Sequence, residues 1–251
     1  MIPCKNCQQP VADKFCPRCG QKASVARITL KKFFTDLPHA IFHLDNGFLF
    51  NIWELFRHPG IAIREYLGGK RKPFYHPASY LVIALIVNYL VVKITNLHFY
   101  DEGELSSMHP LAAKAITDYD AMQWWFLEHT YVYILVAITT SSLFLFGIFR
   151  LMKLGFNLAE TAAIVLFTIA QGVLVQSTIY LCFGWIHSGP FLRTIESVNM
   201  FILIFYASYV MFQLMTSARN MLVRLAVSVL AGMGLAIVWI ATAYLLYLLF
   251  T

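Results

Sequence analysis

Five apolar runs occupy most of the sequence after residue 78, and they constrain its fold more than any other feature. They cover residues 79–95, 131–151, 161–186, 198–215 and 225–250. Each approaches or exceeds the roughly twenty residues that cross about 30 Å of hydrocarbon as an α-helix. Charged residues make up 13% of the chain, whereas soluble domains carry about a quarter. The sequence therefore predicts an all-α polytopic membrane protein, with a five-helix transmembrane bundle over residues 78–251.

Positive charge is concentrated near the N-terminus, where twelve of the nineteen Lys and Arg residues precede residue 73. The first residues, MIPCKNCQQP, are polar and do not resemble a cleavable signal peptide, so we expect the N-terminus in the cytosol. Five spans then leave sixteen cations on the cytoplasmic side, with Lys114 and Arg193 on the other side and Lys93 inside the first span. The positive-inside rule favours this orientation and places the C-terminus on the outer side.

Four of the five cysteines lie within the first twenty residues, in the spacing C-x2-C-x8-C-x2-C. Each pair can turn back so that both thiolates face one ion, and two pairs supply the tetrahedral four-sulfur set that zinc prefers. Residues 1–24 are therefore predicted to form a zinc ribbon covered by Val11 and Phe15. The structural Zn2+ would be held by Cys4, Cys7, Cys16 and Cys19. A rubredoxin-type iron site and a redox dithiol pair are the alternatives.

Residues 25–77 connect the ribbon to the first span. Helical spacing of apolar residues predicts interfacial amphipathic helices over 28–44, over 48–57, and from Pro59 to Leu67 before Gly68 and Gly69. Residues 57–77, called the collar below, hold five cations against the single acidic residue Glu65. These cations are Arg57, Arg64, Lys70, Arg71 and Lys72. We expect the collar to touch membrane lipids with anionic head groups, and a dedicated anion-binding or lipid-binding site is the alternative.

Two resemblances accompany these patterns. The cysteine module, with FCPRCG at its second pair, resembles the short prokaryotic zinc ribbon, although Gln8 stands where glycine often follows the first pair. A bacterial membrane family catalogued as domain of unknown function 3667 is similar to the stretch FHLDNGFLFNIWELFRHPGIAIREYLGGKRKPFYHPASYLVI. The resemblance covers about the first ninety residues. It implies a multi-pass protein of the bacterial inner membrane with a structural zinc site, and it brings no activity or catalytic residue.

Several features inside the spans favour helix packing. Asn157 and Glu160 have the spacing of a capping box before the third span. Gly232 and Gly234 allow close approach of a helix, either within the bundle or from a second protomer in a homo-oligomer. Cys182 is expected in the core. Uncharged polar residues at membrane depth are expected to bond between helices, with a solute path as the second interpretation; they are Asn88, Gln171, Gln176, Thr178, Asn199, Ser208 and Gln213.

No catalytic motif is visible, so the function favoured by the sequence is non-enzymatic. The first hypothesis is a membrane scaffold whose cytoplasmic zinc ribbon recruits a protein partner. The second is a permease for lipids or small solutes that uses the polar bundle residues. A lipid-phosphate-binding enzyme, with the collar cations on the phosphate and His58 or His76 in proton transfer, is a further alternative. The basic residues lie at the expected membrane plane among apolar helices, which argues against nucleic acid as a partner.

Overall fold

The computed structural model describes residues 2–29, 47–97, 110, 114, 129–216 and 220–250. Within these ranges the chain forms seven α-helices and one small two-stranded sheet. Five helices are long and apolar enough to cross a membrane. They are α4 (Pro77–Thr95), α7 (Thr130–Leu151), α8 (Leu158–Phe183), α9 (Gly189–Leu214) and α10 (Met221–Phe250). The predicted all-α, five-span architecture is confirmed.

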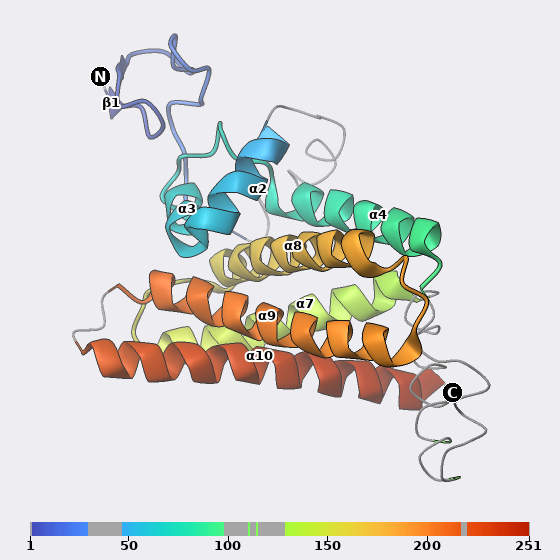
Figure 1. Ribbon diagram of the computed structural model, residues 1–251. Helices are drawn as coiled ribbons and strands as arrows, with labels where there is room; N and C mark the ends of the chain where they lie inside the picture. The colour runs from blue at the N-terminus through green and yellow to red at the C-terminus, as the bar shows by residue number, and fades with distance from the viewer. Residues whose placement is uncertain are drawn as a thin grey trace.

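Helix α8 lies at the centre of the bundle. In its most apolar stretch 67% of the residues are buried inside the protein, against 22–33% in the other four helices. It contacts α4, α7 and α9, while α10 packs against α7 and α9 (Figure 1). The large exposed apolar side chains of the outer helices are therefore the surface that lipid covers in a membrane.

The ends of the predicted spans shift by a few residues, and one shifts further. Helix α9 begins at Gly189, nine residues before the apolar run starts at residue 198. Arg193 and Glu196 lie in the first turns of α9, so the apolar run begins only after them although the helix is continuous. Hydropathy marks the part of a helix that suits lipid, whereas the helix itself continues towards the aqueous boundary.

The bundle has two distinct ends, visible in Figure 1. The ribbon lies at the end where α4 and α8 begin and α9 finishes, and the C-terminus of α10 lies at the opposite end. An odd number of spans produces this separation of the two termini.

Two short helices fill a gap next to α8 at the ribbon end. Tyr80, the fourth residue of α4, lies against Gln171, the fourteenth residue of α8, so α8 extends about 15 Å further than α4 at this end. Helices α2 (Gly47–Arg57) and α3 (Pro59–Leu67) pack against this part of α8, as Figure 1 shows. Their predicted boundaries are confirmed, including Pro59 at the start of α3. Aromatic rings close the shared core: Phe48, Tyr66, Phe74, Tyr75, Tyr80 and Phe167.

The small residues of α10 serve packing within the bundle. A Cβ on Gly232 would lie 2.9 Å from the Ile204 carbonyl oxygen of α9, and one on Gly234 would lie 2.4 Å from the Phe144 ring of α7. Both glycines therefore allow neighbouring helices to approach α10. The expectation for Cys182 is wrong, because its side chain is exposed on α8. An apolar position near the end of a span can face lipid as readily as protein.

Two further expectations fall mostly outside the described residues. An amphipathic helix is expected over 28–44, but residues 30–44 are outside the described residues. Ile28 and Thr29 are described and are not helical. Residues 98–128 hold six acidic residues against one lysine, which predicts an acidic external loop between the first two spans, and the structure describes this stretch only at Pro110 and Lys114.

Candidate metal centre and its junction with the bundle

The ribbon (residues 2–24 in the structure) is built from two similar turns. The chain reverses after each C-x2-C pair, with Gln8 N–H donating to the Cys4 carbonyl (3.0 Å) and Gly20 N–H donating to the Cys16 carbonyl (2.9 Å). Both residues have positive φ, 62° for Gln8 and 71° for Gly20. Strands β1 (Ile2–Pro3) and β2 (Pro10–Val11) pair beside the first turn. Gln8 thus adopts the left-handed conformation that glycine favours at this position.

The two turns bring the four predicted thiols together. The sulfur atoms of Cys4, Cys7, Cys16 and Cys19 all lie within 4.8 Å of one another. Cys4 and Cys19 are separated by 3.6 Å, and Cys7 and Cys16 by 3.5 Å. A tetrahedral site with metal–sulfur bonds of about 2.3 Å has sulfur–sulfur edges of about 3.8 Å. No disulfide joins the cysteines in the described residues, and the arrangement of the four sulfur atoms fits a four-sulfur metal site.

Main-chain N–H groups favour the thiolate form in the second turn. The N–H of Cys19 lowers the pKa of the Cys16 thiol, and the N–H of Gln21 lowers the pKa of the Cys19 thiol. The pKa of the Cys7 thiol is raised to about 11. The N–H of Gln9 lowers it, but loss of water contact and hydrogen bonds with the neighbouring thiols outweigh that effect. The metal-free cluster therefore retains at least one thiol proton at neutral pH.

One of the two side chains expected to cover the metal does so. Val11 is buried beside Cys4 and Cys16, whereas Phe15 is 59% exposed. The expectation for Phe15 is therefore wrong. Its main chain pairs with Lys22 across the second turn and its ring points to solvent.

Gln21 joins the ribbon to the collar. Its side chain is buried, and its amide nitrogen donates to the Gly69 carbonyl (3.0 Å). Its amide oxygen accepts from the N–H groups of Arg71 (3.0 Å) and Lys72 (3.1 Å). Gly69 has φ +110°, and a Cβ there would approach Lys5 and Val25 of the N-terminal segment at 3.4 Å. One side chain of the ribbon thus fixes the main chain of residues 69–72. The positive φ and the close approach of the N-terminal segment explain why residue 69 is glycine.

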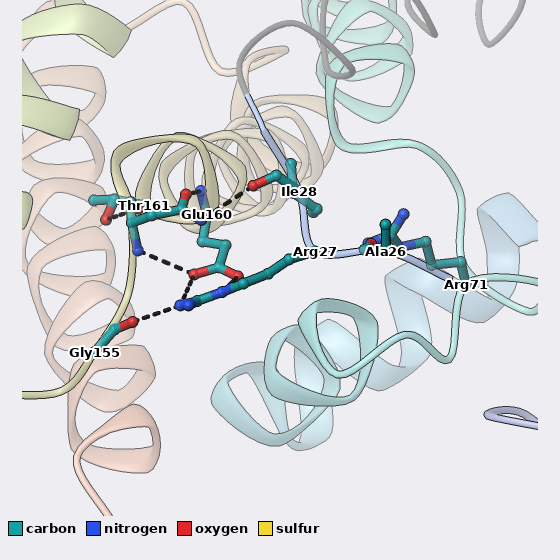
Figure 2. Close-up of polar contacts among 8 residues, drawn as sticks. Ala26, Arg27, Ile28, Arg71, Gly155, Glu160 and Thr161 are labelled. Atoms are coloured by element: carbon teal, nitrogen blue, oxygen red, sulfur yellow. Dashed lines mark hydrogen bonds and ion pairs between the residues drawn. The ribbon is translucent and has the colours of Figure 1, made fainter. Parts of the chain in front are cut away.

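A second junction lies at the start of α8. The arm (residues 25–29) passes along this end of the bundle, and Arg27 donates from Nε and Nη2 to the two carboxylate oxygens of Glu160, each at 2.7 Å. Figure 2 shows the Arg27 guanidinium between this carboxylate and the Gly155 carbonyl, which also accepts from it. The Glu160 carboxylate raises the pKa of Arg27 through these hydrogen bonds and its charge. The Arg71 guanidinium donates to the Ala26 carbonyl at 2.9 Å.

Glu160 also belongs to the predicted capping box. Glu160 N–H donates to the Asn157 side chain (2.9 Å), and the Glu160 carboxylate accepts from Asn157 N–H (3.0 Å). The capping prediction is confirmed. The Asn157 side chain also donates to the Ile28 carbonyl (3.1 Å). Sequence reasoning missed the roles of Arg27 and Gln21, because an ion pair between residues 27 and 160 leaves no local signal.

The structure places the five collar cations on different partners. The Arg57 guanidinium lies 5.2 Å from the centre of the Trp53 ring, and Lys70 pairs with Glu65 at 2.7 Å. Arg71 contacts the arm, and Lys72 contacts Gln21 through its main chain. The lipid-binding or anion-binding role predicted for these cations remains a prediction.

The fifth cation, Arg64, takes part in a reciprocal cap between α3 and α9. Its guanidinium donates to the Leu214 carbonyl and to the Thr216 hydroxyl at the C-terminus of α9. In return the Gln213 side chain accepts from Gly60 N–H at 2.8 Å, at the N-terminus of α3. Burial, together with the charge of Arg224, lowers the pKa of Arg64. The N-terminus of α3 thus gains a hydrogen-bond acceptor from α9, and the C-terminus of α9 gains hydrogen-bond donors from α3.

The polar residues at membrane depth mostly bond within the bundle. Three bond between elements: Asn88 to Ser177, Gln171 to Tyr80, and Gln213 to α3. The side chains of Gln176, Thr178 and Ser208 bond within their own helices. The Asn199 side-chain oxygen is buried and has no hydrogen-bond partner among the described residues. The packing interpretation is confirmed for the first three.

The comparisons with known proteins assign no activity to this site. Residues 45–88 match the model of a family described as a protein of unknown function (DUF3667). The match covers α2, α3, the collar and the first part of α4, and it excludes the cysteine cluster. No curated protein and no solved structure matches the chain.

Proposed function

We propose that this protein is a non-enzymatic scaffold of the inner membrane, in which a structural zinc ribbon on the cytoplasmic side recruits a protein partner. The observation that carries the proposal is the four-thiol cluster in a module whose inner face is fixed to the collar by Gln21. Four cysteine ligands complete the tetrahedral shell of zinc and leave no open position for a substrate. Such a site stabilises the fold of the ribbon, and the surface of the ribbon then binds the partner.

The ribbon exposes side chains that suit a protein-binding surface. Phe15 is 59% exposed and Ile2 is 50% exposed, and the exposed cations Lys14 and Arg18 lie close to Phe15 in the sequence. Exposed aromatic residues and arginines are enriched in protein interfaces. This surface fits a partner that presents an apolar residue surrounded by acidic ones.

Charge supports the cytoplasmic placement. The ribbon end of the bundle carries the collar together with Arg150, Lys153 and Arg224. The positive-inside rule favours a cytoplasmic location for this end and a periplasmic location for the C-terminus.

The bonding within the bundle favours a scaffold over a permease. Asn88, Gln171 and Gln213 hold helices together through hydrogen bonds, which is the usual role of uncharged polar residues in membrane bundles. Side chains that are used to join helices in this way support a rigid bundle, as a scaffold requires.

The test is affinity purification from cross-linked membranes. The partner should be recovered with wild type and with Phe201→Ala, a matched variant of an exposed aromatic residue on α9. It should be lost with Phe15→Ala and with the double variant Cys4→Ser/Cys7→Ser. Recovery of the same partner with the double variant would exclude recruitment by the ribbon. A growth or envelope defect from Gln171→Leu or Asn199→Leu, with both ribbon variants normal, would favour the permease.

A further inference from the structure

Helix α2 has an apolar outer face that the protein leaves uncovered. Its inner face is buried at Asn51 and Leu55, yet Leu49, Trp53 and Phe56 on the outer face are 75%, 57% and 65% exposed. These three residues follow the i, i+4, i+7 spacing of a single helix face. A helix with water on its outer side carries polar residues there, whereas the face of α2 formed by Leu49, Trp53 and Phe56 carries none.

The position of α2 places this face beside the spans. The Ile52 carbonyl accepts from the Gln171 side chain (3.4 Å), and the Leu55 carbonyl accepts from the Tyr206 hydroxyl (3.1 Å). Gln171 lies about 20 Å along α8 from its start at Leu158, and Tyr206 lies about 12 Å before the end of α9. Helix α2 therefore packs alongside the apolar part of the bundle. Its 11 residues span about 16 Å, enough for one leaflet only.

The outer face continues the lipid-facing surface of α9. Phe205 on α9 is 73% exposed and stacks on Tyr209, with 6.5 Å between ring centres. The Tyr209 hydroxyl donates to the Arg57 carbonyl at the end of α2 (3.4 Å). The end of α2 therefore lies next to the part of α9 that lipid covers at Phe205.

A cation stands at the end of this face. The exposed Arg57 guanidinium lies 5.2 Å from the centre of the Trp53 ring. Tryptophan beside arginine, at the limit of an apolar face, is typical of the level of the lipid head groups. A cation at this level is attracted to lipids that carry a net negative charge.

We propose that α2 is embedded in the leaflet at the ribbon end, with Leu49, Trp53 and Phe56 among acyl chains and Arg57 on the head group of an anionic phospholipid. The surface is independent of the ribbon, so it stands or falls separately from partner recruitment.

Fluorescence quenching in vesicles tests the proposal with the full-length protein. The signal of Trp53 is obtained as wild type minus Trp53→Phe, and the signal of Trp185, exposed just after the end of α8, as wild type minus Trp185→Phe. Phosphatidylcholine vesicles carry a minor fraction of lipid brominated on its acyl chains, with either a phosphatidylglycerol or a phosphatidylcholine head group. Aqueous iodide serves as the opposing quencher.

The proposal predicts that brominated lipid quenches Trp53 and iodide does not. Brominated phosphatidylglycerol should act at about fivefold lower mole fraction than brominated phosphatidylcholine, equivalent to ~1 kcal/mol for one cation. Arg57→Gln should abolish this preference and keep the acyl-chain quenching, and Trp185 supplies the control for unselective enrichment. Quenching of Trp53 by iodide would show a water-facing helix, and quenching by neither would show cover by a protein or second copy. Either result overturns the proposal, and equal quenching by both lipids overturns the assignment of Arg57.

Discussion

Arg27 and Glu160 lie 133 residues apart in the sequence and form an ion pair with two nitrogen–oxygen contacts of 2.7 Å. The carboxylate is buried at the N-terminus of the central helix α8, whereas the arginine belongs to the arm that follows the metal-binding module. Together with the bonds of Gln21 to the collar, this pair holds the ribbon on the bundle at two places. The ribbon is thus a fixed part of one end of the bundle.

Arg27→Ala should loosen the arm. It leaves the buried Glu160 carboxylate with the capping N–H of Asn157 alone, which costs about 1–3 kcal/mol. Cleavage within residues 25–29 by a protease that cuts after apolar residues should accelerate by about 5- to 150-fold, because the arm leaves the bundle more often. Arg27→Lys should give a smaller effect, because lysine keeps the charge and loses the paired geometry. Lys22→Ala, which removes an exposed cation of the same segment, should change nothing; unchanged cleavage in Arg27→Ala would contradict the junction.

Gln21→Leu should release the collar from the ribbon without loss of metal. The substitution removes the partners of Gly69 carbonyl, Arg71 N–H and Lys72 N–H, and each group left unpaired costs about 1–3 kcal/mol where water cannot reach it. Exchange of residues 68–72 should accelerate while the metal content of the purified protein stays that of wild type. Gln9→Leu, a matched change of an exposed glutamine in the first turn, should leave the collar protected. Loss of metal in Gln21→Leu would mean that docking and metal binding are one process.

Gly60→Ala should disrupt the contact between α3 and α9. The new Cβ would lie 2.4 Å from Gln213 Cβ and 2.8 Å from the Val210 carbonyl oxygen, so the helices must separate and lose the reciprocal cap. We expect a loss of about 1–3 kcal/mol, measured as a lower melting temperature of the detergent-solubilised protein. Gly147→Ala on α7 provides the contrast, because its Cβ meets nothing within 4 Å and helix propensity favours alanine by about 1 kcal/mol. Equal effects of the two substitutions would contradict the close approach at Gly60.

Metal affinity should fall as the pH is lowered. The raised pKa of Cys7, about 11 without metal, means that the cluster retains at least one thiol proton at neutral pH and that metal binding must displace it. Below that pKa, each unit decrease in pH should weaken binding by about tenfold for each proton released. Competition with a chelator of known pH dependence, from pH 8 to pH 6, measures the slope. A constant affinity over this range would mean that no thiol proton is displaced.

The sequence predicts those features that depend on local spacing or on composition. The cysteine spacing predicts the cluster, apolar length predicts the five spans, and the Asn157–Glu160 spacing predicts the cap; the structure bears out all three. Pairings across the fold, such as Arg27 with Glu160, have no local signature. Hydropathy also treats lipid and protein interior alike, which is why Cys182 was expected in the core and is exposed.

The glycines and prolines of the collar show the same limit in another form. The glycines and prolines between Arg57 and Pro77 predict a defined backbone at the collar, and Gly60 and Gly69 have that role. Their reasons, a close approach of α9 and a ribbon packed against the loop, depend on elements far away in the sequence. Local patterns therefore indicate where the backbone is constrained but not which partner constrains it.

Elemental analysis of the purified protein tests the central claim most directly. We predict about one zinc ion per chain, retained after dialysis against a weak chelator and lost in Cys4→Ser/Cys7→Ser, because the four thiols form a single closed site. Iron at one ion per chain with little zinc, or no metal in protein purified under reducing conditions, would contradict a structural zinc ribbon.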